Sequence, residues 1–193
     1  MTQPGVSAKG ARRKADLARA AAALVLREGP GALTHRRVAH EAGASVSATT
    51  YYFGSLDQIA AAAGGALADA WAEHARAALA TAQGTAVEDP QAVARLLADA
   101  VLPPGDDEQV RSHYENLLGA GRDTALATAF AAGRAVVDDV VGELVARVGA
   151  PTSAHVTIAL VDGAVVTALT EGRPVRPTAV ALLVAAWSGG APT

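Results

Sequence analysis

The chain has 193 residues, of which 51% are hydrophobic and 18% charged, and its formal net charge is −3. This length suits one large domain or two small ones, and the apolar content is enough for a sizeable core, which excludes a largely disordered protein. The absence of cysteine excludes a disulfide framework, thiol catalysis and cysteine-ligated metal sites, and it suits a reducing cytoplasm.

The charge is divided unevenly along the chain. Residues 1–56, which we call the head, carry eight Lys or Arg against three Asp or Glu, a net charge of +5. Residues 57–193, the body, carry eight against sixteen, a net charge of −8. A cationic head on an acidic body is typical of proteins that present one end to a polyanion. Basic residues that only keep an alanine-rich helix soluble would give the same count.

The first predicted element is an amphipathic helix over residues 12–28. Apolar side chains recur there at helical spacing, at positions 17, 20, 21, 24 and 25. The run Gly29-Pro30-Gly31 then ends the helix.

Two short helices joined at a glycine follow. Thr34 is suited to cap the first of them, and Gly43 can adopt the left-handed conformation that ends a helix. Ser45 is the next cap and begins a second helix over residues 46–52, which Gly54 ends. A short helix, a tight turn with glycine and a second helix form a helix-turn-helix, whose second helix can lie in the major groove of DNA.

The body is predicted to be helical throughout, with no window that favours a strand. Ser55, Asp89 and Asp106 are predicted N-caps, and Gln58 and Gln109 complete capping boxes with the first and last of them. The predicted helices span residues 55–83, 90–101, 106–121, 123–148, 152–172 and 177–188.

Residues 12–60, which cover most of the head and the start of the body, carry several short motifs in a fixed order. A first helix that ends in R-E-G is followed by L-T-x-x-x-V-A-x-x-A-G, and then by Y-Y-F and a Ser-capped helix. In these motifs the chain resembles the TetR family of transcriptional regulators. The resemblance implies an all-α protein with an N-terminal three-helix head, residues 1–56, that binds DNA. It implies a larger helical body, residues 57–193, that binds an effector and dimerises.

This resemblance implies a ligand-responsive regulator, most often a repressor, that binds a palindromic operator as a homodimer in a bacterial cytoplasm. Two residues depart from the family pattern. Thr50 stands where the family usually has tyrosine, which displaces the aromatic pair to Tyr51 and Tyr52, and Leu56 replaces a basic residue that usually contacts a phosphate. These departures leave an alternative open: a helical small-molecule-binding protein whose head no longer binds DNA specifically.

The DNA contacts are assigned from the residue types and from the resemblance. Base contacts are expected from the second helix, where Val46 and Ala48 could contact thymine methyl groups and no Arg or Asn offers a bidentate contact. Arg36 and Arg37 can reach phosphates, and Arg36 could also reach a guanine. Helix packing or capping is the alternative explanation for each residue. The predicted DNA-binding residues are Thr34, Arg36, Arg37, Ser45, Val46, Ser47, Ala48, Thr50, Tyr51 and Tyr52.

The predicted helix over residues 152–172 is apolar nearly all round, unlike a surface helix of a monomer. In the family the last two long helices pair with those of a second subunit, and the V-D-G at residues 161–163 resembles that landmark. A helix buried inside a monomer would show the same pattern. The apolar stretch, residues 156–169, contains Asp162 and is too short to cross a bilayer. The predicted dimer interface comprises Ala159, Leu160, Gly163, Val166, Leu183, Val184 and Trp187.

An effector pocket in the body is implied by the resemblance alone. Its predicted lining residues, which are of types more often found as plain core residues, are Trp71, His74, Tyr114, Leu117, Leu118 and Phe130. An enzyme is not predicted, because the five histidines lack metal-ligand spacing and no nucleophile elbow or P-loop is present. No catalytic residue, metal or cofactor is therefore expected.

Overall fold

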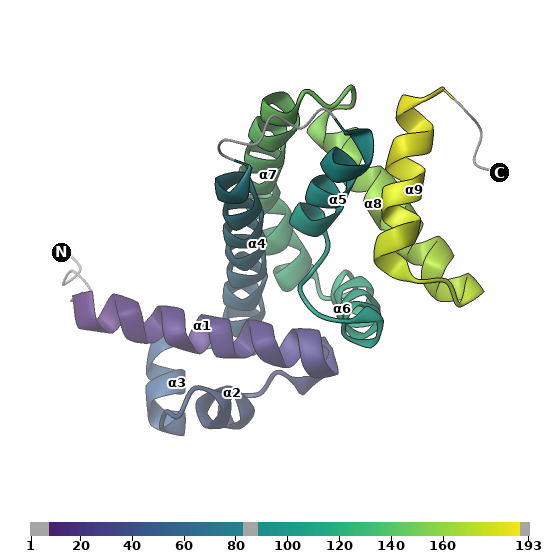
Figure 1. Ribbon diagram of the computed structural model, residues 1–193. Helices are drawn as coiled ribbons and strands as arrows, with labels where there is room; N and C mark the ends of the chain where they lie inside the picture. Colours follow the sequence, from purple (N-terminus) through teal and green to yellow (C-terminus); the bar gives the residue numbers. More distant parts are fainter. Residues whose placement is uncertain (1–7, 83–88, 190–193) are drawn as a thin grey trace. The chain divides into compact units, whose positions relative to one another are not determined.

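The computed structural model describes residues 8–82 and 89–189 of the chain. Every regular element in this part is helical, which confirms the all-α prediction (Figure 1). The described residues form two compact units. The first unit draws on residues 1–69 and 112–133, and the second on residues 70–111 and 134–193. The division of function at residue 56 stays a prediction.

The first unit contains the predicted helix-turn-helix. Its elements are α1 (Ala8–Glu28), the 3-10 turn η1 (Pro30–Ala32), α2 (His35–Glu41), α3 (Val46–Tyr52), and parts of α4 (Leu56–Thr81), α6 (Asp107–Ala120) and α7 (Thr124–Val148). α1 lies across α2 and α3 and packs against α2, which in turn packs against α3 (Figure 1). The core is built from buried side chains of these helices, among them Leu17, Leu24, Val38, Phe53, Ile59 and Leu126.

The predicted boundaries of α2 and α3 are confirmed. The Thr34 hydroxyl accepts from the Arg37 backbone N–H at 3.1 Å, and the Ser45 hydroxyl accepts from Ala48 N–H at 3.2 Å. Gly43 has a φ of 57°, and the N–H groups of Gly43 and Ala44 bond back to carbonyls of α2. This paired bonding satisfies the last carbonyls of the helix and requires the left-handed residue at Gly43.

The second unit contains three helices that pack together, α5 (Pro90–Val101), α8 (Ala154–Glu171) and α9 (Val175–Trp187), and the remaining parts of α4, α6 and α7. Arg176 at the start of α9 donates to the Asp99 carboxylate at 2.7 Å and to the Pro103 carbonyl at 2.8 Å. Asp107 accepts from the Val175 backbone N–H at 3.1 Å. These contacts join the start of α9 to the end of α5, to the connection that follows it and to the start of α6.

Two helices begin earlier than predicted. α1 starts at Ala8 instead of residue 12, because its exposed first turn carries no apolar repeat by which the start could be recognised. α9 starts at Val175 instead of residue 177, so Pro177 lies inside its first turn. Proline is tolerated there because the first N–H groups of a helix have no partner within the helix.

The predicted capping boxes are confirmed with one shift of register. Asp106 and Gln109 exchange two hydrogen bonds of 2.9 Å. At the start of α4, Gln58 N–H donates to the Ser55 hydroxyl at 3.2 Å, but the Gln58 side chain accepts from Gly54 and not from Ser55. Asp89 caps α5 by accepting from Gln91 N–H, as predicted.

α8 is 18 residues long, longer than the apolar stretch seen in the sequence, and its length and composition are sufficient for a membrane span. Buried core helices can have the same length and composition. Seven of its residues are buried and the helix packs against α9, as in a core helix.

Candidate nucleic-acid interface

The second helix of the motif, α3, presents an open face. Ser47 and Thr50 are exposed, the Val46 side chain is 46% exposed and the Tyr51 side chain 83%. Thr49, on the opposite side, is fully buried. The caps and Thr49 hold the helix in the unit, so the side chains predicted to contact base edges remain accessible.

The two tyrosines of α3 differ in exposure: the ring of Tyr51 is exposed, and the ring of Tyr52 supports it. Tyr51 and Tyr52 pack edge to face, with ring centroids 5.0 Å apart and an interplanar angle of 83°. Tyr52 is partly buried and packs against the core of the first unit. Its ring therefore restricts how Tyr51 can be oriented. Ala48 is half-buried, whereas Ser45 and Thr34 are exposed beside the N–H groups that they cap.

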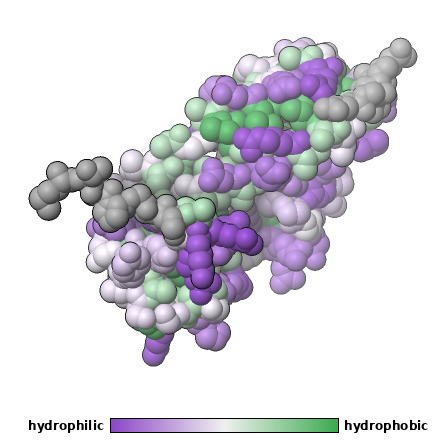
Figure 2. Space-filling view, turned by 90° about the vertical axis from the view of Figure 1, so that its left-hand side faces the viewer, coloured by the Kyte–Doolittle hydropathy of each residue, from purple (hydrophilic) through white to green (hydrophobic). Residues whose placement is uncertain are grey.

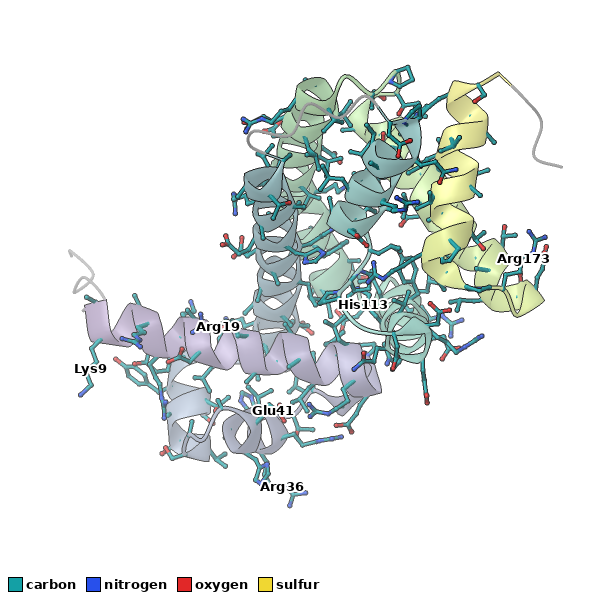
Figure 3. All side chains as sticks on the ribbon, viewed as in Figure 1. Lys9, Arg19, Arg36, Glu41, His113 and Arg173 are labelled. Carbon is teal, nitrogen blue, oxygen red and sulfur yellow. The ribbon has the colours of Figure 1, made fainter. Side chains whose placement is uncertain are left out.

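The basic side chains of the head differ in whether they have interaction partners among the described residues. Arg36 is exposed, extends from α2 away from α1 (Figure 3) and has no hydrogen bond or ion pair within the described residues. Arg13 donates to the Gly43 carbonyl at 3.3 Å, and the Lys14 ammonium lies 5.7 Å from the centre of the Phe53 ring. Arg13 and Lys14 therefore help to fix the turn and α3 in addition to any contact with a polyanion.

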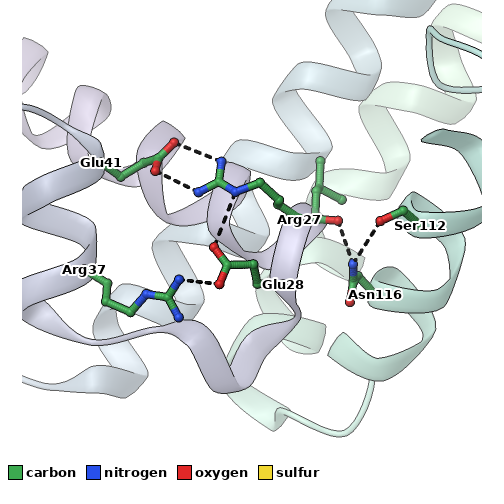
Figure 4. A network of polar contacts seen from close by, with 7 residues as sticks. Arg27, Glu28, Arg37, Glu41, Ser112 and Asn116 are labelled. Carbon is green, nitrogen blue, oxygen red and sulfur yellow. Dashed lines mark hydrogen bonds and ion pairs between the residues drawn. The ribbon is translucent and has the colours of Figure 1, made fainter. Parts of the chain in front are cut away.

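Arg37, a predicted phosphate contact, is held in an ion pair with Glu28 (Figure 4). Arg27 bonds to both carboxylate oxygens of Glu41, at 2.8 and 3.2 Å, and to Glu28 at 3.3 Å. The hydrogen bond from Arg37 lowers the pKa of Glu28, and the hydrogen bond from Arg27 lowers the pKa of Glu41. Glu28 and Glu41 were not predicted from the sequence, because their ion pairs with Arg37 and Arg27 connect two different helices.

The residues predicted to line an effector pocket fall in both compact units. Tyr114, Leu117, Leu118 and Phe130 belong to the first unit and Trp71 and His74 to the second. Leu117 and Phe130 pack against the core of the first unit, whereas Leu118 is 71% exposed. Tyr114 contacts the ring of His113, whose burial lowers its pKa.

Trp71 lies beside charged residues that were not among the predicted site residues. The guanidinium carbon of Arg134 lies 5.0 Å from the centre of the Trp71 ring. Arg134 also donates to Asp138 at 2.8 Å, and His155 Nε2 lies 3.3 Å from the other oxygen of that carboxylate. The i, i+4 spacing of Arg134 and Asp138 was the only available signal, and it is typical of surface pairs on any helix. His74 Nε2 lies 2.7 Å from the Asp99 carbonyl oxygen, so its ring is already partnered.

Two hollows lie within single units. A cavity of about 320 Å³ in the second unit is lined by residues that include Pro90, Val93, Val148, Val184 and Trp187. An open groove in the first unit runs along α4 and α7 past Asp57 and Asp123. Neither is lined by a predicted effector-binding residue.

The residues predicted to form the dimer interface differ in how deeply they are buried. Ala159, Gly163 and Val166 are exposed along one side of α8, and Leu160 is half-buried. Leu183 is fully buried inside the second unit, so it can support such a surface but cannot line it. Val184 and Trp187 are half-buried, and Trp187 Nε1 donates to the Thr152 hydroxyl at 3.3 Å. On one face of the molecule, hydrophobic side chains gather in a band between polar ones (Figure 2).

The chain is similar to known proteins in its sequence and in its fold. A family model described as the tetracyclin repressor-like C-terminal domain matches residues 88–189. The chain belongs to the TetR family. A search of curated proteins found no match. The TetR family is one of transcriptional regulators and not of enzymes, which confirms the predicted family and the absence of an enzymatic role.

Several solved structures are similar to this chain over most of its length. The multidrug binding protein EbrR in complex with imidazole is 30% identical, with a TM-score of 0.60, covering 89% of this chain and 92% of that one. The EbrR complex with proflavin is also 30% identical, with a TM-score of 0.57, covering 89% and 97%. A TetR family member from Streptomyces coelicolor A3 is 27% identical, with a TM-score of 0.55, covering 89% and 95%.

Proposed function

We propose that this TetR-family regulator is a ligand-responsive repressor that binds a palindromic operator as a homodimer in the cytoplasm. The observation that carries the proposal is the open face of α3, with Val46, Ser47, Thr50 and Tyr51 accessible on a helix anchored by its caps and by Thr49. A helix of this kind can enter a major groove, and a two-fold dimer would place two of them roughly 34–36 Å apart, one turn of DNA.

Base reading through α3 would rely on apolar and hydroxyl groups. Val46 and Ala48 suit thymine methyl groups, and the hydroxyl groups of Ser47 and Tyr51 can donate or accept hydrogen bonds. Because α3 has no Arg, Asn or Gln, a bidentate contact would have to come from Arg36, which is exposed in α2. We assign DNA binding to residues 1–56 and effector binding and dimerisation to residues 57–193.

Tyr51→Ala is expected to lower the preference for operator over unrelated DNA by about tenfold, the scale of one specific base contact. Tyr51 is mostly exposed, so its loss should leave the fold intact. The measurement is a mobility-shift titration of the chain's own upstream region and of unrelated duplex. Leu118→Ala removes another exposed apolar side chain from the same unit and serves as the control. Equal weakening on both duplexes would remove Tyr51 from base reading.

A helical small-molecule-binding protein without specific DNA binding is the second candidate. Leu56 favours it, because an exposed apolar side chain stands where the TetR pattern has a cation. The wild-type titration decides between the two candidates: no specific retardation of the upstream region at any salt concentration would favour the binding protein over the repressor.

For the effector we propose a flat aromatic cation that contacts Trp71. EbrR binds proflavin and ethidium, which are molecules of this class, and it is similar to this chain over most of its length. Arg134 already places a planar cation against the Trp71 ring, and Asp138 supplies the opposite charge. A ligand cation would take the place of the guanidinium, since both interact with the ring in the same way.

Arg134→Ala and Asp138→Asn are expected to change proflavin affinity in opposite directions, each about three- to tenfold. The first removes a competing cation from the Trp71 ring and the second removes the carboxylate that would pair with the ligand. Quenching of Trp71 fluorescence in a Trp187→Phe background measures binding. The ion pair of Arg147 and Glu143, also at i, i+4 spacing on α7, provides matched control substitutions. Unchanged affinity in both test variants would place the ligand elsewhere.

A further inference from the structure

The first unit contains four charged side chains that neutralise one another. Arg27 and Glu28 end α1, and Arg37 and Glu41 belong to α2. Glu28 contacts both guanidinium groups, whereas Glu41 is bound by both terminal nitrogens of Arg27 (Figure 4). Two positive and two negative charges therefore form one network with no net charge.

This network shows where the excess positive charge of the head resides. The third acidic residue of the head, Asp16, pairs with Arg19. All three acidic side chains are thus matched by Arg27, Arg37 and Arg19, and the net +5 is left on the five remaining basic residues. These are Lys9, Arg12, Arg13, Lys14 and Arg36. Four of them lie in the first two turns of α1, and Arg36 is the only one in α2.

We propose that Glu28 is a positioning residue for DNA binding: it keeps Arg37 in a neutral pair, so that α2 offers its phosphate contact through Arg36 alone. This proposal rests on the DNA-binding function proposed above. It revises the expectation that Arg36 and Arg37 both contact phosphates. Arg36 and Arg37 are neighbours in sequence, but only Arg37 has a carboxylate partner within the described residues.

A free Arg37 would strengthen DNA binding, because counterions leave DNA when a protein cation binds a phosphate. A protein cation that neutralises a phosphate releases a condensed counterion and steepens the dependence of affinity on salt, by about 0.9 units per phosphate. An exposed ion pair is weak, so the effect of Glu28 lies in the balance of charge and not in holding Arg37 rigidly: suppose that Arg37 turned away from Glu28 to a phosphate. Glu28 would then face the same polyanion unpaired, so the pair as a whole gains little. Glu28 thereby keeps the sequence-independent part of DNA affinity low.

Removing the charge of Glu28 should release Arg37, and Arg27 should lose only its contact of 3.3 Å with Glu28. Arg27 keeps its two bonds to Glu41, so the contact between α1 and α2 remains. Glu28→Gln keeps the size of the side chain and can still accept a hydrogen bond. The thermal midpoint of this variant should stay close to that of the wild type, because an exposed pair contributes little to stability.

The test measures the affinity of the full chain for an unrelated duplex at several salt concentrations between 50 and 200 mM. For Glu28→Gln we expect a plot of log affinity against log salt that is steeper by about one unit than that of the wild type, with tighter binding at low salt. For the double variant Glu28→Gln with Arg37→Ala we expect the slope of the wild type again. Glu143→Gln, which adds the same charge in the second unit by breaking the pair with Arg147, should leave the slope unchanged.

Two results would overturn the proposal. One is a Glu28→Gln slope equal to that of the wild type. The other is a steep slope that persists in the double variant, because the added charge would then act through a side chain other than Arg37. If the wild-type chain binds no duplex at any salt concentration, the DNA-binding function itself fails. That outcome is recognised from the wild type alone, before any variant is compared.

Discussion

Gly64→Ala is expected to destabilise the first unit by up to about 3 kcal/mol, the scale of overpacking in a close-packed core. A Cβ at Gly64 would be driven into the Leu126 carbonyl oxygen, and would lie 3.0 Å from the Phe130 backbone nitrogen and 3.1 Å from the Ala129 Cβ. Most of these atoms are backbone of α7 and cannot rotate away. The two helices must therefore move apart.

The neighbouring glycine provides a matched control. A Cβ at Gly65 meets nothing within 4 Å, so Gly65→Ala should be neutral or stabilise α4 by roughly 0.5–1 kcal/mol, because alanine favours a helix more than glycine does. Chemical denaturation followed by circular dichroism measures both variants. A Gly64→Ala protein as stable as Gly65→Ala would show that α4 and α7 do not approach as closely as the structure describes.

Val166→Asp is expected to convert the proposed dimer to a monomer. Operator binding should weaken by about 100-fold or more, because each monomer then binds one half-site without a linked partner on the other. Val166 lies on the exposed side of α8 with Ala159 and Gly163, and its side chain is 54% exposed. The isolated subunit should therefore fold normally. A carboxylate buried in an apolar subunit contact would remain without a partner, which is strongly unfavourable.

Sedimentation velocity distinguishes the two assembly states, and circular dichroism tests the fold. Val136→Asp places the same charge on an exposed valine of α7, outside the proposed surface, and should leave the dimer intact. If Val166→Asp sedimented as a dimer, the subunit contact would lie on another face of the second unit.

The sequence predicted the local features of the fold well because few residues decide them. Thr34, Ser45, Asp89 and Asp106 cap their helices as expected, each through an N–H group two or three residues away. The left-handed Gly43 was likewise predictable. Pro177 misled the prediction for α9, because proline marks a boundary without showing on which side of it the helix begins.

Local sequence by itself therefore determined which segments are helical, where α2 turns into α3 and which residues α3 can offer to a duplex, because caps and spacing act within one or two turns. Only the tertiary structure decided which charged groups neutralise each other and which apolar groups face solvent. Glu28 and Arg37 lie nine positions apart on different helices, so only the packing of α1 against α2 brings them together. Leu183 is buried and Val166 exposed in helices whose apolar residues are spread all round, because the surroundings of a helix, and not its own pattern, determine which apolar side is covered.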